Sequence, residues 1–169
     1  MAKNLFQAFY FTFAIIYGLK VMRGSPWLPP SLGGTEEGDI LNCIKNVPFV
    51  KPIEGALTYA LVMMGYHAGD LFHHVFIHPK QNDYYEMLLH HMTTLCLCGS
   101  MIYANQLAIG CIITLLHDFA DLPGVLAKIL AETKYVSAAA VVFVSCILSW
   151  IWTRNIMLTR IVYLIITEW

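Results

Sequence analysis

The chain has 169 residues, of which 58% are hydrophobic and 12% are charged, and its formal net charge is −1. Soluble domains carry about 25% charged residues, so this composition excludes an ordinary soluble protein, and the lack of a basic excess excludes nucleic acid as an expected partner. The five cysteines are odd in number and lie mostly within apolar stretches. They are therefore expected to be packing residues and not a disulfide framework.

Five apolar stretches predict five membrane-spanning helices. A helix needs about 20 residues to cross the roughly 30 Å of hydrocarbon in a bilayer. The last stretch is longer than that and is expected to tilt or protrude. The sequence thus predicts an all-α, polytopic membrane helix bundle that forms a single domain over residues 1–169. The predicted spans cover about residues 5–21, 54–77, 84–103, 107–131 and 135–166.

The connection over residues 24–53 differs from the rest of the chain because it is rich in proline and glycine. These residues exclude a membrane helix. We expect an extramembrane loop that packs over the helix ends or against a partner. Proline also predicts the end of the second span, at His78-Pro79, and a kink in the fourth, at Pro123-Gly124. Lysines and arginines occur on both sides of the predicted topology, so the charge distribution fixes no orientation.

Ionisable residues interrupt the predicted spans in three places. Such a residue at the centre of a membrane helix costs about 2.5–3.5 kcal/mol, so it is expected to face a cavity and to pair with another polar group. Counting from the predicted helix ends places all three clusters in the half of the membrane nearer the N-terminus. The clusters are His67 with Asp70, the pair His90-His91, and His117-Asp118 with Asp121.

The chemistry of these clusters favours proton or acyl transfer over metal binding. A carboxylate beside a histidine fixes the tautomer of the ring, which suits a general base or an acyl-accepting imidazole. His74 and His78 have the i,i+4 spacing of the histidine boxes in membrane di-iron hydroxylases. Those enzymes need about eight histidines in recurring boxes, whereas this chain has 7 with other spacings. No metal site is predicted.

Residues 83–121 contain three motifs at defined distances. They are Asp83 and Glu86-Met87 ahead of His90-His91 and Thr94, then Tyr103-Ala104-Asn105 with Ile109-Gly110, then Leu115-Leu116-His117-Asp118 with Asp121. Together they resemble the Lag motif of ceramide synthases, which belong to the TLC domain family of membrane proteins. Gly65-Tyr66 with Asp70 on one side, and Thr159-Arg160 on the other, extend this resemblance to about residues 65–162.

The resemblance implies an all-α bundle around a central cavity and transfer of a fatty acyl group from acyl-CoA to the amine of a sphingoid base. It implies that His90 or His91 accepts the acyl group or deprotonates the amine, and that three further residues orient and neutralise that histidine. No metal or redox cofactor is implied, and acyl-CoA would be a co-substrate. The implied catalytic residues are His90, His91, His117, Asp118 and Asp121, and the implied substrate-binding or lipid-binding residues are Tyr66, Asp70, Thr94 and Arg160.

The chain departs from the family pattern at Ala108, at Ala120 and at Val125, and it ends at Trp169, where the family has at least one more transmembrane helix. A truncated TLC-like fold is therefore expected, with one wall of its cavity open to lipid or to other membrane subunits. Two functions stay open: an acyl-CoA-dependent N-acyltransferase, or a non-catalytic, lipid-contacting subunit of a larger membrane complex that retains the motif. The enzyme would belong in the endoplasmic reticulum, and the subunit in an organelle membrane such as the mitochondrial inner membrane.

Overall fold

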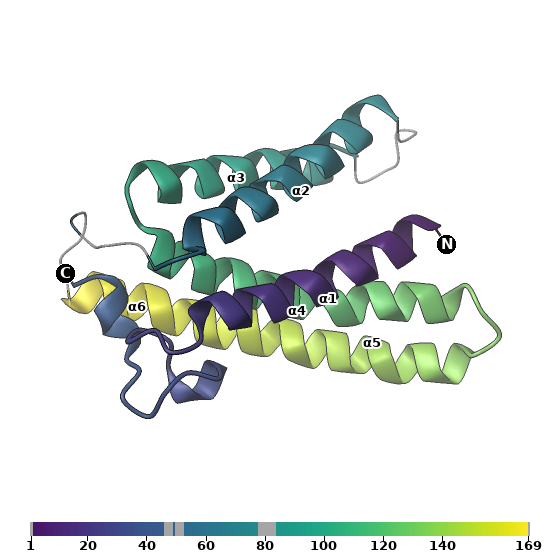
Figure 1. Cartoon of the computed structure of the whole chain (residues 1–169). Coiled ribbons are helices and arrows are strands. Elements are labelled where there is room, and N and C mark those ends of the chain that lie inside the picture. The colour runs from purple at the N-terminus through teal and green to yellow at the C-terminus, as the bar shows by residue number, and fades with distance from the viewer. Residues whose placement is uncertain (1, 46–48, 50–52, 78–83, 169) are drawn as a thin grey trace.

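The computed structural model describes residues 2–45, 49, 53–77 and 84–168 and is helical in every regular element of these residues (Figure 1). Short 3₁₀ helices, η1 (Pro30–Leu32) and η2 (Ile40–Cys43), lie in the first long connection, and a π-helical segment, η3 (Ile151–Met157), joins the last two helices. The longer helices are α1 (Ala2–Met22), α2 (Ala56–Phe76), α3 (Tyr84–Tyr103), α4 (Leu107–Ala131), α5 (Val136–Trp150) and α6 (Leu158–Glu168).

The predicted all-α bundle is confirmed, and α3 and α4 have the predicted bounds. The fifth predicted span is one continuous helical segment, formed by α5, η3 and α6. α4 continues through Pro123, the position where the sequence predicts a kink. His78, Pro79 and Asp83 lie outside the described residues.

Three segments are long and apolar enough to cross a membrane: α1, α4 and the 32 residues of Val136–Thr167. α2 and α3 have 21 and 20 residues, which is sufficient length for a span. Their histidines and acidic residues make them less apolar than the other three. The chain is an integral membrane protein whose two most polar long helices carry part of the predicted site.

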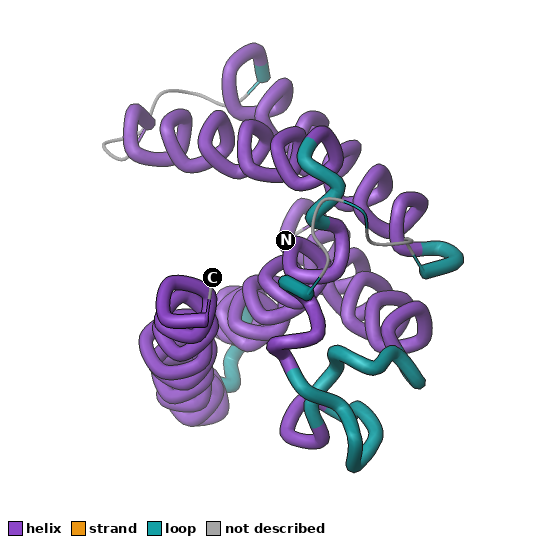
Figure 2. The backbone as a smooth tube through the Cα atoms, turned by 90° about the vertical axis from the view of Figure 1, so that its left-hand side faces the viewer, coloured by secondary structure: helices purple, strands orange, loops and turns teal. Residues whose placement is uncertain are grey.

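Helix α4 is the centre of the bundle, because α1 and α5 both pack along it (Figure 1). Helices α2 and α3 form a hairpin that lies on one side of the layer of α1, α4 and α5, as the view in Figure 2 also shows. The N-terminal end of α1 and the α4–α5 turn lie at one end of the bundle (Figure 1). The α3–α4 turn and the end of α6 lie at the other end.

Helices α1, α2 and α4 supply most of the buried core. Tyr59 and Met63 of α2 are completely buried, as is Cys111 of α4. The α5–α6 segment lies at the outside of the bundle and exposes large apolar side chains, including Val141 and Leu148. An apolar outer surface of this kind is suited to contact with lipid acyl chains.

The described part of the 24–53 connection packs over the helix ends, as predicted. Trp27 and Leu28 are buried, and so is Cys43 of η2. The Asp39 carboxylate accepts a hydrogen bond from the Leu41 backbone N–H at 3.0 Å and so caps η2. This connection is therefore a packed structural element; its position outside the membrane stays a prediction.

Candidate active site

A cavity of about 210 Å³ lies among α2, α3, α4 and η3. Small-molecule pockets usually measure about 300 Å³ or more, so this cavity has room for reacting groups and not for a whole lipid. One part of its wall is apolar and comes from α3 and α4, near the turn that joins them. The ionisable part of the wall comprises His67, His90, His117, Asp118, Asp121 and Arg154.

Helix α4 contributes three of these ionisable residues because of their spacing. His117 and Asp121 are one helical turn apart and share a face, and Asp118 is rotated by about 100° from His117. The ring of His117 is held in place by a hydrogen bond of 2.7 Å between its Nδ1 and the backbone oxygen of Ile113. A carbonyl oxygen only accepts, so Nδ1 carries the proton and Nε2 of the neutral ring keeps its lone pair. His117 thus has the tautomer of a base acting through Nε2.

Asp118 is the most deeply buried acidic residue of the described chain, with a relative exposure of 1%. Its Oδ2 atom is buried and has no hydrogen-bond partner among the described residues. Burying a carboxylate oxygen without a partner is costly. Such a group in the wall of a cavity is suited to receive a hydrogen bond from a bound ligand.

Asp121 forms an ion pair with Arg154, with a distance of 2.7 Å between Oδ1 and Nη2. Arg154 belongs to the π-helical segment η3, and single π-helical turns are frequent at functional sites. Arg154 is not among the site residues that the sequence motifs predict. The available signal was an arginine inside the longest apolar stretch, which indicates a buried partner.

The two adjacent histidines of α3 face different surroundings. His90 lines the cavity, whereas His91 is buried and lies 3.6 Å from Asp70, measured from Nε2 to Oδ2. Asp70 is also 3.6 Å from the Lys3 ammonium, and the His74 ring lies 5.7 Å from that of His91. The structure thus separates the predicted residues into a cavity group and a second polar cluster between α1, α2 and α3.

The remaining predicted residues are distributed as follows. Thr94 lines the cavity and donates a hydrogen bond to the backbone oxygen of His90 at 2.9 Å. Tyr66 stacks on Tyr10 of α1, with ring centroids 3.4 Å apart, and so holds α1 against α2. Arg160 lines a separate cavity next to η1 and η2. His67, which the sequence analysis paired with Asp70, is instead the contribution of α2 to the main cavity.

The described residues contain no group of three or more His, Cys, Asp or Glu side chains arranged to hold a metal ion. His78, one of the two histidines considered for a metal box, lies outside these residues. The ionisable groups of the cavity are two carboxylates, one guanidinium and three imidazoles. This set is suited to orienting a polar head group and to moving a proton.

The central cavity of this helical membrane bundle is lined by the His-Asp motif of α4 and by a histidine of α3. These two features define the class of protein: a helical membrane protein with a histidine–carboxylate site inside the bundle. The TLC domain family model matches residues 1–169, and the chain belongs to this family. The resemblance expected from the motifs is therefore confirmed.

Individual proteins with sequence similarity to the chain give a more specific comparison than the family model. The chain is similar to ceramide synthase hyl-2 of Caenorhabditis elegans, with 29% identity over 91% of this chain and 44% of the relative. It is also 29% identical to ceramide synthase hyl-1 of the same organism, over 92% of the chain and 41% of the relative. Human ceramide synthase 5 is 24% identical over 94% of the chain and 36% of the relative. The chain spans less than half the length of these relatives, and no solved structure matches it.

Proposed function

We propose that the chain provides the site of a ceramide-synthase-type acyltransferase, which transfers an acyl group from acyl-CoA to the amine of a sphingoid base. The observation that carries this proposal is the convergence of His90, His117 and Asp118 from two helices on one cavity. The similarity to proteins named ceramide synthase supports it. We place the protein in the endoplasmic reticulum membrane, as the family resemblance implies. The relatives reported above give no support to the mitochondrial inner membrane.

In the proposed reaction the amine nitrogen attacks the thioester carbonyl carbon. The C–N bond of the amide forms, the C–S bond breaks, and CoA leaves as its thiol. One amine proton passes to Nε2 of His117, whose Nδ1 is held by the Ile113 carbonyl, and is then delivered to the leaving sulfur. A correctly placed base of this kind accelerates a reaction by about 10²–10⁴-fold.

The other residues of the cavity have positioning roles in this proposal. Asp118, with its unpartnered Oδ2, accepts a hydrogen bond from the amine and orients the lone pair of the nitrogen. His90, on the facing helix, donates a hydrogen bond to the thioester oxygen, where negative charge develops. His91 stays outside the reaction because it pairs with Asp70.

The test is an acyltransferase assay with radiolabelled acyl-CoA and a sphingoid base on the reconstituted protein. We expect His117→Ala and His90→Ala each to lower turnover by 100-fold or more. His91→Ala should lower it far less, through packing alone. Leu89→Ala, on the lipid-exposed side of α3, serves as the matched control and should retain turnover.

A wild-type protein without turnover in every acyl-CoA tested, isolated in a stable complex with other membrane proteins, would contradict the proposal and favour the structural-subunit alternative. Equal losses in the His90 and His91 variants would contradict the separation of roles. Size-exclusion profiles of all variants distinguish lost chemistry from lost folding.

A further inference from the structure

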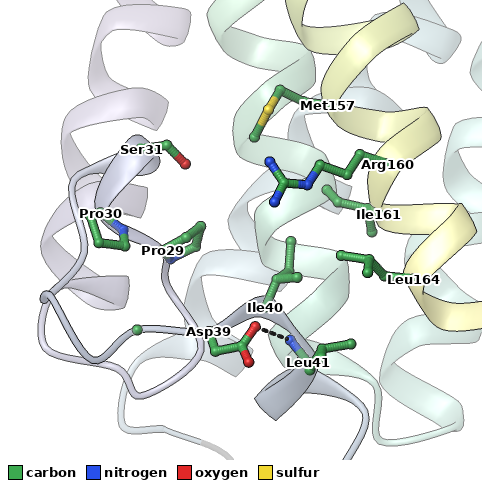
Figure 3. A pocket seen from close by; sticks show the side chains of 11 residues that line it. Pro29, Pro30, Ser31, Asp39, Ile40, Leu41, Met157, Arg160, Ile161 and Leu164 are labelled. Carbon is green, nitrogen blue, oxygen red and sulfur yellow. Dashed lines mark hydrogen bonds between the residues drawn. The ribbon is translucent and has the colours of Figure 1, made fainter. Parts of the chain in front are cut away.

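A second cavity, of about 440 Å³, lies between the 24–53 connection and the helical segment formed by η3 and α6 (Figure 3). The proposed acyltransferase site does not include it. Its wall from the helical segment is mostly apolar and is formed by Met157, Ile161 and Leu164. Among the described residues, Arg160 is the only cation in the lining. The volume falls within the range of about 300–1,000 Å³ that is typical of small-molecule pockets.

The Arg160 side chain extends from α6 into this cavity, toward the connection (Figure 3). No carboxylate of the described residues forms an ion pair with Arg160. A planar guanidinium without a carboxylate partner is a preferred binding group for phosphate, with which it forms two parallel hydrogen bonds. The cavity thus offers a phosphate site with apolar walls.

The depth of Arg160 in the membrane fits a lipid headgroup. Val136–Thr167 has 32 residues, which corresponds to a length of about 48 Å. The hydrocarbon region takes up about 20 residues, so a span that begins at Val136 leaves it near residue 155. Arg160 then lies at the level of the lipid phosphates, and the packed connection that covers it lies at the same level.

The part of the connection over residues 31–42 carries negative charges and no positive one. Residues 31–42 contain Glu36, Glu37 and Asp39 and no lysine or arginine. Of these acidic residues only Asp39 lines the cavity, where Figure 3 shows its carboxylate on the side of the connection. Among the described residues, the lining therefore pairs one cation with one anion, and their formal charges cancel. This pattern matches a headgroup that carries a phosphate and an amine.

We propose that this cavity binds a zwitterionic phospholipid of the phosphatidylethanolamine type, with its phosphate on Arg160 and its ammonium group toward Asp39. Met157 of η3, which lies one turn nearer the bilayer centre than Arg160, contacts the first methylenes of its acyl chains. Bound in this way, the lipid joins the 24–53 connection to the end of the last helix. The site is independent of the proposed catalytic reaction.

The test measures lipid binding to purified full-length chain by native mass spectrometry, with dioleoyl phosphatidylethanolamine, dioleoyl phosphatidylglycerol and CoA as probes. We expect wild-type protein to retain phosphatidylethanolamine with at least tenfold higher affinity than phosphatidylglycerol. Arg160→Gln should weaken binding of phosphatidylethanolamine about tenfold or more, because a charge-assisted contact to phosphate is lost. Lys45→Gln removes one positive charge from the 24–53 connection, outside the cavity, and should leave binding unchanged.

Asp39→Asn tests the second contact. Asparagine keeps an oxygen that accepts the Leu41 N–H and so preserves the cap of η2, but it removes the negative charge. We expect this variant to lose the preference for phosphatidylethanolamine over phosphatidylglycerol.

Equal binding of both lipids to the wild type would overturn the proposal in favour of a general phosphate site. Displacement of lipid by CoA would overturn it in favour of a substrate site. Unchanged lipid binding in Arg160→Gln would overturn the proposal outright. The comparison of the three probes on wild-type protein tests the proposal even where a variant does not fold.

Discussion

The ion pair between Arg154 and Asp121 shows how strongly a single residue of the cavity depends on its partner. The guanidinium and the carboxylate are 2.7 Å apart, and their side chains are 19% and 38% exposed. Removing one member of a buried pair leaves an uncompensated charge and costs about 3–5 kcal/mol. Because the Asp121 side chain is more than a third exposed, the expected cost is smaller, about 1–2 kcal/mol.

We therefore expect Arg154→Met to lower the free energy of unfolding by about 1–2 kcal/mol, and the double variant Arg154→Met/Asp121→Leu to recover most of this loss. The measurement is unfolding in mixed micelles with increasing SDS, followed by circular dichroism. If the double variant is less stable than the single variant, the pair is held by other contacts and the prediction is wrong.

At the scale of residues, the sequence predicted which α4 side chains share a face, and not how neighbouring elements complete the cavity that they line. The spacing of His117 and Asp121 places both on one helix face whatever else the fold does. Which of His90 and His91 faces the cavity depends on the rotation of α3 about its own axis, which tertiary packing sets. The reach of Arg154 to Asp121 depends on a seven-residue π-helical segment. Such a segment shifts the helical phase and has no clear sequence signal.

At the scale of elements, two glycines have opposite packing requirements. A Cβ atom at Gly18 of α1 would lie 2.8 Å from the hydroxyl oxygen of Tyr59, whereas a Cβ atom at Gly65 of α2 would meet no atom within 4 Å. Tyr59 is completely buried, so it has little room to move. Gly18 thus sets the distance at which α1 packs against α2.

Gly18→Ala is expected to destabilise the bundle, since overpacking costs about 1–3 kcal/mol and exceeds the roughly 1 kcal/mol that alanine gains over glycine in a helix. Gly65→Ala is the matched control and should gain up to about 1 kcal/mol. The same SDS unfolding experiment measures both. A stabilised Gly18→Ala protein would mean that α1 and α2 are not in close contact at this point.

The helices themselves were the most predictable part of the fold. Turn residues on both sides gave α3 and α4 their predicted bounds, because such residues end a helix. The π-helical segment and the two 3₁₀ helices were not predicted. Their formation depends on local hydrogen bonds, such as the Asp39 cap of η2, and not on the hydrophobic pattern.

At the scale of the whole molecule, polar contacts hold together one end of the bundle. The Asn4 amide donates a hydrogen bond to the Glu132 carboxylate at 2.6 Å, which joins the start of α1 to the α4–α5 turn. The contact between Lys3 and Asp70 joins the same part of α1 to the last two turns of α2. These contacts place the C-terminal end of α2 at the end of the bundle that carries the α4–α5 turn.

This arrangement predicts that the α2–α3 hairpin crosses the membrane together with α1, α4 and the α5–α6 segment. Ile77→Cys, at the end of α2, should then react with a membrane-impermeant maleimide from the same side of sealed vesicles as Lys134→Cys in the α4–α5 turn. Tyr103→Cys, at the far end of α3, should react only from the opposite side. Peptide mass spectrometry identifies the labelled residue among the native cysteines, and lysed vesicles show that every site is reactive.

Labelling of Ile77→Cys from the same side as Tyr103→Cys would mean that only three segments span the membrane. In that topology the polar residues of α2 and α3 would have no hydrocarbon to avoid, and the burial of His91 against Asp70 would have to arise from packing alone.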